Sequence, residues 1–216
     1  LRKKLLRKSI VIHPLSSYLP QQIFKSDYES EEKIWIDILL ITGNTVNKNF
    51  NYTLKLLSQI LEITKKNKVK CPRFHLVGLN NIPELETLPR KNIINHGKNI
   101  AIKDLVKIHL NCEFYLSLSS EEGFGIPLLD SLLLGLFPII SNIDSYNEII
   151  YNYEYLDFKY LFINLDLNSS VSSKNIIEFM NKNYTKIRKN KLMSINKYKK
   201  NYDNLVKINK DKLNFI

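Results

Sequence analysis

The chain has 216 residues, enough for one sizeable domain with a hydrophobic core. Its formal net charge is +11, but the lysines are spread along the chain instead of forming one stripe, which disfavours a nucleic-acid-binding protein. Two cysteines, Cys71 and Cys112, are too few for a disulfide framework or a metal site. No apolar run approaches the ~20 residues of a membrane span, and no signal peptide is visible. We therefore expect a cytoplasmic protein.

Hydrophobic patterning along the chain predicts strands that alternate with helices. Apolar runs predict strands at 9–13, 35–42, 72–78, 92–96, 113–118, 137–140 and 160–163. Apolar residues at helical spacing predict helices at 50–66, 102–110, 127–135 and 144–150, followed by a helical, lysine-rich remainder. Several strands are apolar throughout, as in a parallel sheet that is covered on both faces. We predict an α/β fold with one Rossmann-like parallel sheet and helices on both faces.

The stretch from Ser119 to Gly135 carries the strongest functional signal. A predicted strand leads into a loop in which Gly123 and Gly125 allow close approach of the backbone to a ligand, and a helix follows. Backbone N–H groups at a helix N-terminus bind anions, most often phosphate. Glu122 and Asp130 cannot bind phosphate, so we expect them to accept hydrogen bonds from hydroxyl groups. Phosphate donors beside hydroxyl acceptors indicate a site for a sugar nucleotide.

The residues of this stretch resemble a known signature. Glu122-Gly123-Phe124-Gly125-Ile126-Pro127, then Asp130, and later Gly135-Leu136-Phe137-Pro138-Ile139-Ile140-Ser141 resemble the Glu-x7-Glu motif of retaining GT-B glycosyltransferases, family 4 (glycosyl transferases group 1). Asn147-Glu148-Ile149-Ile150 is similar to a later segment of that family. The resemblance implies the C-terminal, donor-binding half of a two-domain enzyme.

The resemblance also implies a division of the chain. Residues 1–14 would be a linker and the strand by which the chain enters from a missing N-terminal domain. Residues 15–185 would form the nucleotide-sugar-binding domain, and 186–216 a lysine-rich helical segment. The first residue, Leu1, agrees with a fragment of a longer protein. We expect this fragment alone to be inactive.

Roles in the loop that contains Glu122 follow from the resemblance. Glu122 would accept hydrogen bonds from hydroxyls of the transferred sugar and is one of two residues that we expect to be catalytic. Asp130, where the family has Glu, would accept hydrogen bonds from the ribose. Backbone N–H groups of Phe124, Gly125 and Ile126 would hold the phosphates.

Two further loops complete the expected site. The first runs from Gly43 to Asn49, and by resemblance its Lys48 would contact the diphosphate and stabilise it as it leaves, the second catalytic role. The arginine that usually accompanies this lysine is absent, and Asn44 or Asn47 stands in its place.

The second loop holds His96 and Lys98, which by resemblance would lie beside the nucleotide base; a surface role for His96 is an equal alternative. His75, on a predicted strand, is more typical of a core histidine than of a ligand. Ser141 and Glu148 are secondary candidates.

The sequence thus predicts the donor domain of a retaining glycosyltransferase that binds a UDP-sugar or GDP-sugar and needs no metal or other cofactor. A carbohydrate or lipid-linked acceptor would bind to the missing N-terminal domain. The main alternative is a non-catalytic nucleotide-sugar-binding module; a basic nucleic-acid-binding domain and a sugar-nucleotide epimerase are weaker ones. The lysine-rich C-terminal segment would either touch a membrane surface or pack on the missing domain.

Overall fold

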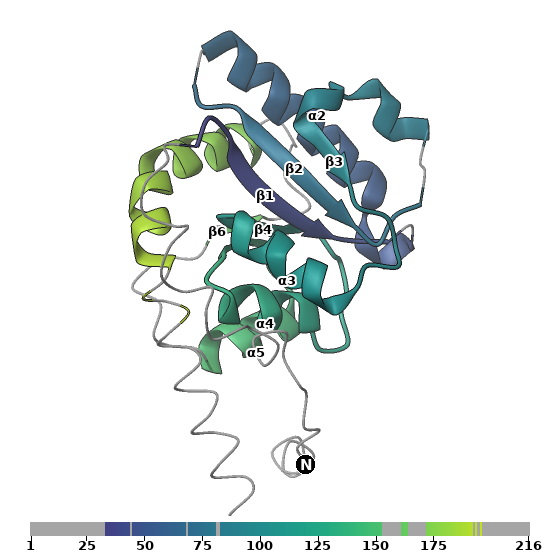
Figure 1. The fold of residues 1–216 in the computed structure, drawn as a ribbon. Helices are drawn as coiled ribbons and strands as arrows, with labels where there is room; N and C mark the ends of the chain where they lie inside the picture. Colours follow the sequence, from purple (N-terminus) through teal and green to yellow (C-terminus); the bar gives the residue numbers. More distant parts are fainter. Residues whose placement is uncertain are drawn as a thin grey trace, which may run out of the picture.

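Six parallel strands form the sheet at the centre of the computed structural model, which describes residues 33–43, 45–67, 69–80, 83–152, 161–163, 172–191, 193 and 195 (Figure 1). Their spatial order is β3-β2-β1-β4-β5-β6. The strands are β1 (Ile36–Ile41), β2 (Pro72–Val77), β3 (Ile93–Asn95), β4 (Phe114–Ser117), β5 (Phe137–Ser141) and β6 (Leu161–Ile163). The order reverses between β1 and β4, which is the topology of the Rossmann fold.

Helices cover both faces of this sheet (Figure 1). Strand residues Ile36, Ile38 and Leu40 share one buried cluster with α2 (Phe50–Asn67) and with the helical residues 172–191. On the other face, Leu39 belongs to a second cluster. That cluster also holds residues of α3 (Ile102–Asn111), α4 (Ile126–Leu133) and α5 (Asp144–Asn152). Successive strand residues point to opposite faces, so both clusters require apolar residues and the strands read as continuous apolar runs.

The predicted α/β fold is confirmed, with small shifts in the element boundaries. The helix predicted at 127–135 begins at Ile126 and ends at Leu133, because Gly135 adopts a left-handed φ of 75° just beyond it. The strand predicted at 92–96 is the shorter β3. Short 3-10 helices that were not predicted are η2 (Val46–Lys48), η3 (Pro83–Thr87) and η4 (Arg90–Asn92).

The expected division into segments falls largely outside the described residues. The strand predicted at 9–13 and the expected boundary at residue 14 lie there. The helical stretch 172–191 runs across the expected boundary at residue 186, and Ile187 and Lys191 within it are buried. None of the described helices combines the length and the apolar character that crossing a membrane requires.

Candidate functional site

The site lies at the carboxyl ends of β1 and β4, where the strand order reverses and where ligands bind in open α/β sheets. Two loops meet there. The backbone N–H of Ser120 donates to the carbonyl of Asn47 over 2.9 Å, and the Asn49 side chain donates to the carbonyl of Leu118 over 2.8 Å. Asn49 takes a left-handed φ of 48° that turns the chain from η2 into α2. These bonds hold the loop after β1 against the loop after β4.

Glu122 and Lys48, the two predicted catalytic residues, contact each other although they lie 74 positions apart in the chain. Lys48 Nζ donates to Glu122 Oε1. Their side chains are only 20% and 13% exposed, so the ion pair is partly shielded from water. The same Oε1 accepts a hydrogen bond from Ser119 Oγ at 2.8 Å. No described residue donates to Glu122 Oε2, which is left for a ligand.

Tyr146, from α5, adds a third donor to Glu122. Its hydroxyl lies 3.3 Å from Glu122 Oε1 and 2.7 Å from Ser117 Oγ. Burial raises the pKa of Tyr146 to about 12, so the phenol keeps its proton at neutral pH. Ser117, Ser119 and Tyr146 were not predicted as site residues. The available signal was the position of Tyr146 directly before the segment at 147–150 that resembles the family.

The N-terminus of α4 has the geometry expected of an anion site. Gly125 is its N-cap, with a φ of 86°, and Pro127 lies in the first turn. A Cβ atom on Gly125 would lie 2.8 Å from Tyr146 Cε1, so the glycine permits close packing between this loop and α5. Within the described residues the backbone N–H groups of Phe124, Gly125 and Ile126 have no hydrogen-bond acceptor. These three groups are available to a phosphate.

The other predicted residues surround this centre at different depths. Asp130 is buried within α4, and Gly123 is exposed in the loop before it. Gly43 lies two residues after the end of β1, and no atom lies within 4 Å of a Cβ added to it. Asn44 lies outside the described residues. In the loop after β3, Lys98 is exposed.

His96, in the same loop, is half-buried and bonded to a strand residue. Its Nε2 lies 3.0 Å from Nδ1 of His75, which is a buried residue of β2 as predicted. His75 Nε2 in turn lies 3.1 Å from Oδ1 of Asp37 in β1. Neither of these two contacts was predicted. They connect the loop after β3 to the middle of the sheet.

Ser141 and Glu148, the secondary candidates, lie at the end of β5 and within α5. Ser141 Oγ donates to the carbonyl of Ser119 and so supports the loop that carries Glu122. In the part of the chain that the structure describes, no three His, Cys, Asp or Glu side chains are grouped in a way that could hold a metal ion.

The family model of glycosyl transferases group 1 matches residues 37–202, which span both loops, α4 and α5. The chain belongs to this family. The matched range includes Lys48, the Glu122 loop and the N-terminus of α4.

Sequence relatives are viral proteins with the same general description. The chain is 25% identical over 120 residues to putative glycosyltransferase 41 of Sulfolobus islandicus filamentous virus (isolate Iceland/Hveragerdi). This match covers 56% of this chain and 31% of that protein. The chain is 33% identical over 70 residues to putative glycosyltransferase ORF330 of Acidianus filamentous virus 2 (isolate Italy/Pozzuoli), covering 26% of this chain and 21% of that protein. The matched part thus spans less than a third of the length of either relative.

Solved structures share the fold. WaaG, a glycosyltransferase involved in lipopolysaccharide biosynthesis, has a TM-score of 0.58 at 14% identity, over 77% of this chain and 43% of its own. The pneumococcal O-GlcNAc transferase GtfA, solved with UDP and GlcNAc, has a TM-score of 0.55 at 17% identity, over 82% of this chain and 36% of its own. The catalytic domain of cholesterol-alpha-glucosyltransferase from Helicobacter pylori has a TM-score of 0.52 at 16% identity, over 77% of this chain and 98% of its own.

Proposed function

We propose that this group 1 chain is the donor-binding part of a glycosyltransferase that uses a UDP-sugar or GDP-sugar. The observation that carries the proposal is the meeting of Lys48 and Glu122 at the switch point of the sheet, beside the unused N–H groups at the start of α4. This arrangement sets cationic and N–H donors for a diphosphate next to a carboxylate that can accept hydrogen bonds from sugar hydroxyls.

Binding of the donor does not require the ion pair to break. An ammonium group has three N–H donors, so Lys48 Nζ can keep its contact with Glu122 while it donates to a phosphate oxygen. Ser119 and Tyr146 hold Oε1 of Glu122 in place, and Oε2 is left to accept from the sugar. Asp130, by the position it shares with the family signature, would accept from the ribose.

Transfer of the sugar builds negative charge on the departing diphosphate and positive charge at the anomeric carbon. The α4 N-terminus and Lys48 would stabilise the departing diphosphate, as preorganised groups in a partly shielded site. We propose a retaining reaction that needs no metal, with a carbohydrate or lipid-linked acceptor held by an N-terminal domain of the longer protein. The Glu-x7-Glu resemblance supports this part of the proposal. A cytoplasmic location, with peripheral contact to a membrane, belongs to the same proposal.

Calorimetric titration with UDP, GDP, UDP-glucose and GDP-mannose tests the proposal. We expect one base to bind, and Lys48→Met to weaken the bare diphosphate and the sugar nucleotide alike. Glu122→Gln should weaken the sugar nucleotide by about tenfold or more, and more than it weakens the bare diphosphate, because it removes a charged acceptor that the sugar hydroxyls meet directly. Glu121→Gln, at the exposed neighbouring position, is the matched control. Equal losses for Glu121→Gln and Glu122→Gln would contradict the proposed role of Glu122.

A non-catalytic nucleotide-sugar-binding module is the second candidate, because the first loop carries no arginine. Asn47 stands near the position of that arginine, but its side chain contacts Thr45 Oγ1 at 2.6 Å and the carbonyl of Glu121 at 3.5 Å. A neutral amide with these contacts cannot replace a bidentate guanidinium on phosphate. Release of sugar from the bound donor by the full-length protein favours the transferase; tight binding without release favours the module.

A further inference from the structure

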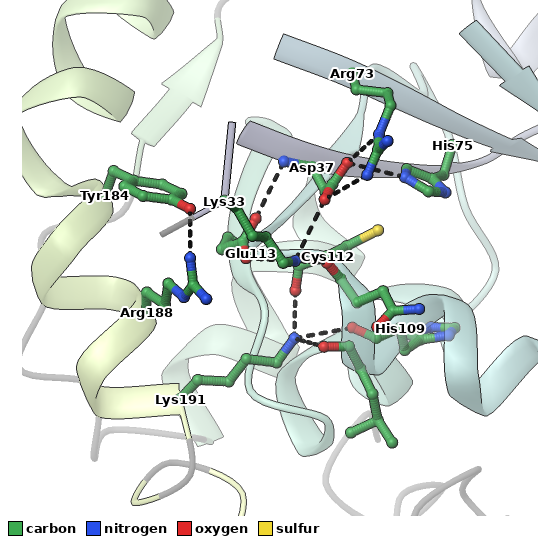
Figure 2. Close-up of polar contacts among 12 residues, drawn as sticks. Lys33, Asp37, Arg73, His75, His109, Cys112, Glu113, Tyr184, Arg188 and Lys191 are labelled. Atoms are coloured by element: carbon green, nitrogen blue, oxygen red, sulfur yellow. Dashed lines mark hydrogen bonds and ion pairs between the residues drawn. The ribbon is translucent and has the colours of Figure 1, made fainter. Parts of the chain in front are cut away.

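A line of polar side chains crosses the sheet from β1 to the loop after β3. It consists of Asp37, His75 and His96, joined by contacts of 3.1 Å and 3.0 Å. Figure 2 shows the first part of the line, with dashed lines that join Asp37 to Arg73 and to His75. Asp37 is fully buried and His75 is 7% exposed, whereas His96 is half-buried at the carboxyl edge of the sheet. The line therefore connects a buried charge with the edge that carries the proposed donor site.

The charge on Asp37 fixes the direction of the first hydrogen bond, and an uncharged His75 would fix the direction of the second. Burial alone would raise the pKa of Asp37, but hydrogen bonds from His75 and Arg73 and the charge of Lys33 lower it well below its usual range. The ionised carboxylate can only accept, so His75 donates to it through Nε2–H. A neutral imidazole has one N–H, which leaves a lone pair on His75 Nδ1. On an uncharged His75 that lone pair would accept a hydrogen bond from Nε2–H of His96, whose Nε2 lies 3.0 Å away.

The geometry of the two rings agrees with this hydrogen bond. Their planes are 14° apart and their centroids 5.3 Å apart, close to the largest separation that an N···N distance of 3.0 Å permits. The rings therefore meet edge to edge, with each nitrogen directed at the other, instead of overlapping face to face. With its proton on Nε2, His96 carries a lone pair on Nδ1. No described residue contacts His96 Nδ1, and it is not one of the buried polar atoms without a partner, so a ligand can reach it.

We propose that Asp37 and His75 are positioning residues that hold His96 in this tautomer, and that His96 Nδ1 accepts a hydrogen bond from a ring N–H of the donor's base. The inference rests on the proposed function. Uracil at N3 and guanine at N1 offer such an N–H, whereas cytosine and adenine have a lone pair at the corresponding ring nitrogen. Two facing lone pairs would leave both unsatisfied. The line thus selects UDP and GDP against CDP and ADP.

A purely structural role accounts less well for His75 and His96. Asp37 already receives hydrogen bonds from Arg73 at 2.6 and 3.0 Å and from Lys33 at 3.3 Å, so it does not need His75 for neutralisation. Lys33 also pairs with Glu113 at 2.9 Å. The negative charges of Asp37 and Glu113 are thus balanced by the positive charges of Arg73 and Lys33. Extending this balanced cluster by two imidazoles to the sheet edge has a desolvation cost that an apolar pair would avoid. A ligand that reads the end of the line accounts for the cost.

Protonation of the histidine pair reverses its polarity. With one added proton, His75 donates through Nδ1–H to His96 Nε2, and His96 then presents Nδ1–H as a donor. The charged groups that face the pair are Asp37 and, around it, Arg73, Lys33 and Glu113. Burial and the neighbouring His75 lower the pKa of His96, which favours the uncharged form of that ring. Acid should therefore erode the preference for UDP over CDP.

Two measurements on the protein test the inference. Nitrogen-15 spectra of the imidazole rings report which nitrogen of His96 carries the proton, and we expect Nε2 in the free protein at neutral pH. Titration with UDP and CDP should show a preference for UDP of roughly tenfold or more, the effect of one hydrogen bond gained and one lone-pair clash avoided. His75→Leu should lower that ratio, since His96 loses the acceptor that fixes its tautomer. His75→Asn, which keeps an acceptor near the place of Nδ1, should restore much of it.

The outcomes separate this inference from the proposed function. A protonated Nδ1 on His96 at neutral pH overturns the inference, whatever nucleotide binds. Equal affinity for UDP and CDP, or a UDP preference that His75→Leu leaves intact in a folded protein, overturns it while the donor site stands. Weaker nucleoside diphosphate binding in Lys48→Met, together with a proton on Nε2 of His96 and a UDP preference that His75→Leu lowers, supports both.

Discussion

Gly125→Ala should destabilise the protein through the close approach of the Glu122 loop to α5. Gly125 has a φ of 86°, where a residue with a Cβ loses roughly 1–2 kcal/mol. The new Cβ would lie 2.8 Å from Tyr146 Cε1 and 3.2 Å from Ile149 Cδ1, and forced overpacking of this kind costs about 1–3 kcal/mol more. The free energy of unfolding should fall by about 2–5 kcal/mol, which for a chain of this size lowers Tm by roughly 4–20 °C.

Thermal and denaturant unfolding of a matched pair measures this effect. Gly123→Ala is the control, because no atom lies within 4 Å of its added Cβ and its φ is not positive. We expect the control to change stability by no more than about 0.5 kcal/mol. Because Tyr146 also donates to Glu122, displacement of its ring by Gly125→Ala should weaken sugar-nucleotide binding as well. Equal stability of the two variants would refute the argument from close approach.

Three further predictions concern buried polar groups. Tyr146→Phe removes the hydroxyl that contacts Ser117 and Glu122, so it should lower stability by roughly 1–2 kcal/mol in denaturant unfolding and weaken UDP-sugar more than UDP. Lys191→Met leaves the carbonyls of His109, Leu110 and Cys112 without the buried ammonium that contacts all three (Figure 2) and should cost at least about 2 kcal/mol; a neutral result would show that water replaces it. Burial lowers the pKa of His109 from 6.5 to about 4. As the pH falls from 6.5 to 4, the unfolded chain therefore binds a proton at His109 while the folded chain does not, and the free energy of unfolding should fall by about 3 kcal/mol. His109→Leu should flatten that part of the pH–stability profile, and an unchanged slope would contradict the assignment.

The sequence was sufficient for the fold because local patterns and global topology agree. Continuous apolar runs alternate with amphipathic helices, and this pattern leads to a parallel sheet covered on both faces. Boundaries were less predictable, since a three-residue strand such as β3 gives little periodic signal. The 3-10 turn η2 was missed for a similar reason, as its three residues carry no pattern of their own.

Contacts within the site could be predicted only as a convergence of loops. The resemblance pointed to Lys48 and Glu122 separately, but their ion pair depends on β1 and β4 being neighbours. Tyr146 reaches the same carboxylate from α5, and no spacing in the sequence links it to Glu122. Such contacts depend on strand order and register, which sequence patterns on their own do not specify.

Strand register also explains why the line from Asp37 to His96 escaped prediction, and why it points to function. In β1 and β2, Asp37 lies opposite Arg73 and Leu39 opposite His75, so Asp37 and His75 share one face and meet diagonally. Ile94 of β3 lies opposite His75. His96 follows two residues later, on the same face of the sheet, and so lies within reach of the His75 ring. Apolar residues could have occupied these positions. On the same face of the sheet, the neighbouring positions hold Leu39 in β1 and Tyr115 in β4, and both belong to the second buried cluster. Natural sequences depart from local rules mainly where function requires it, and the polar residues inside these strands end at the edge where we place the base.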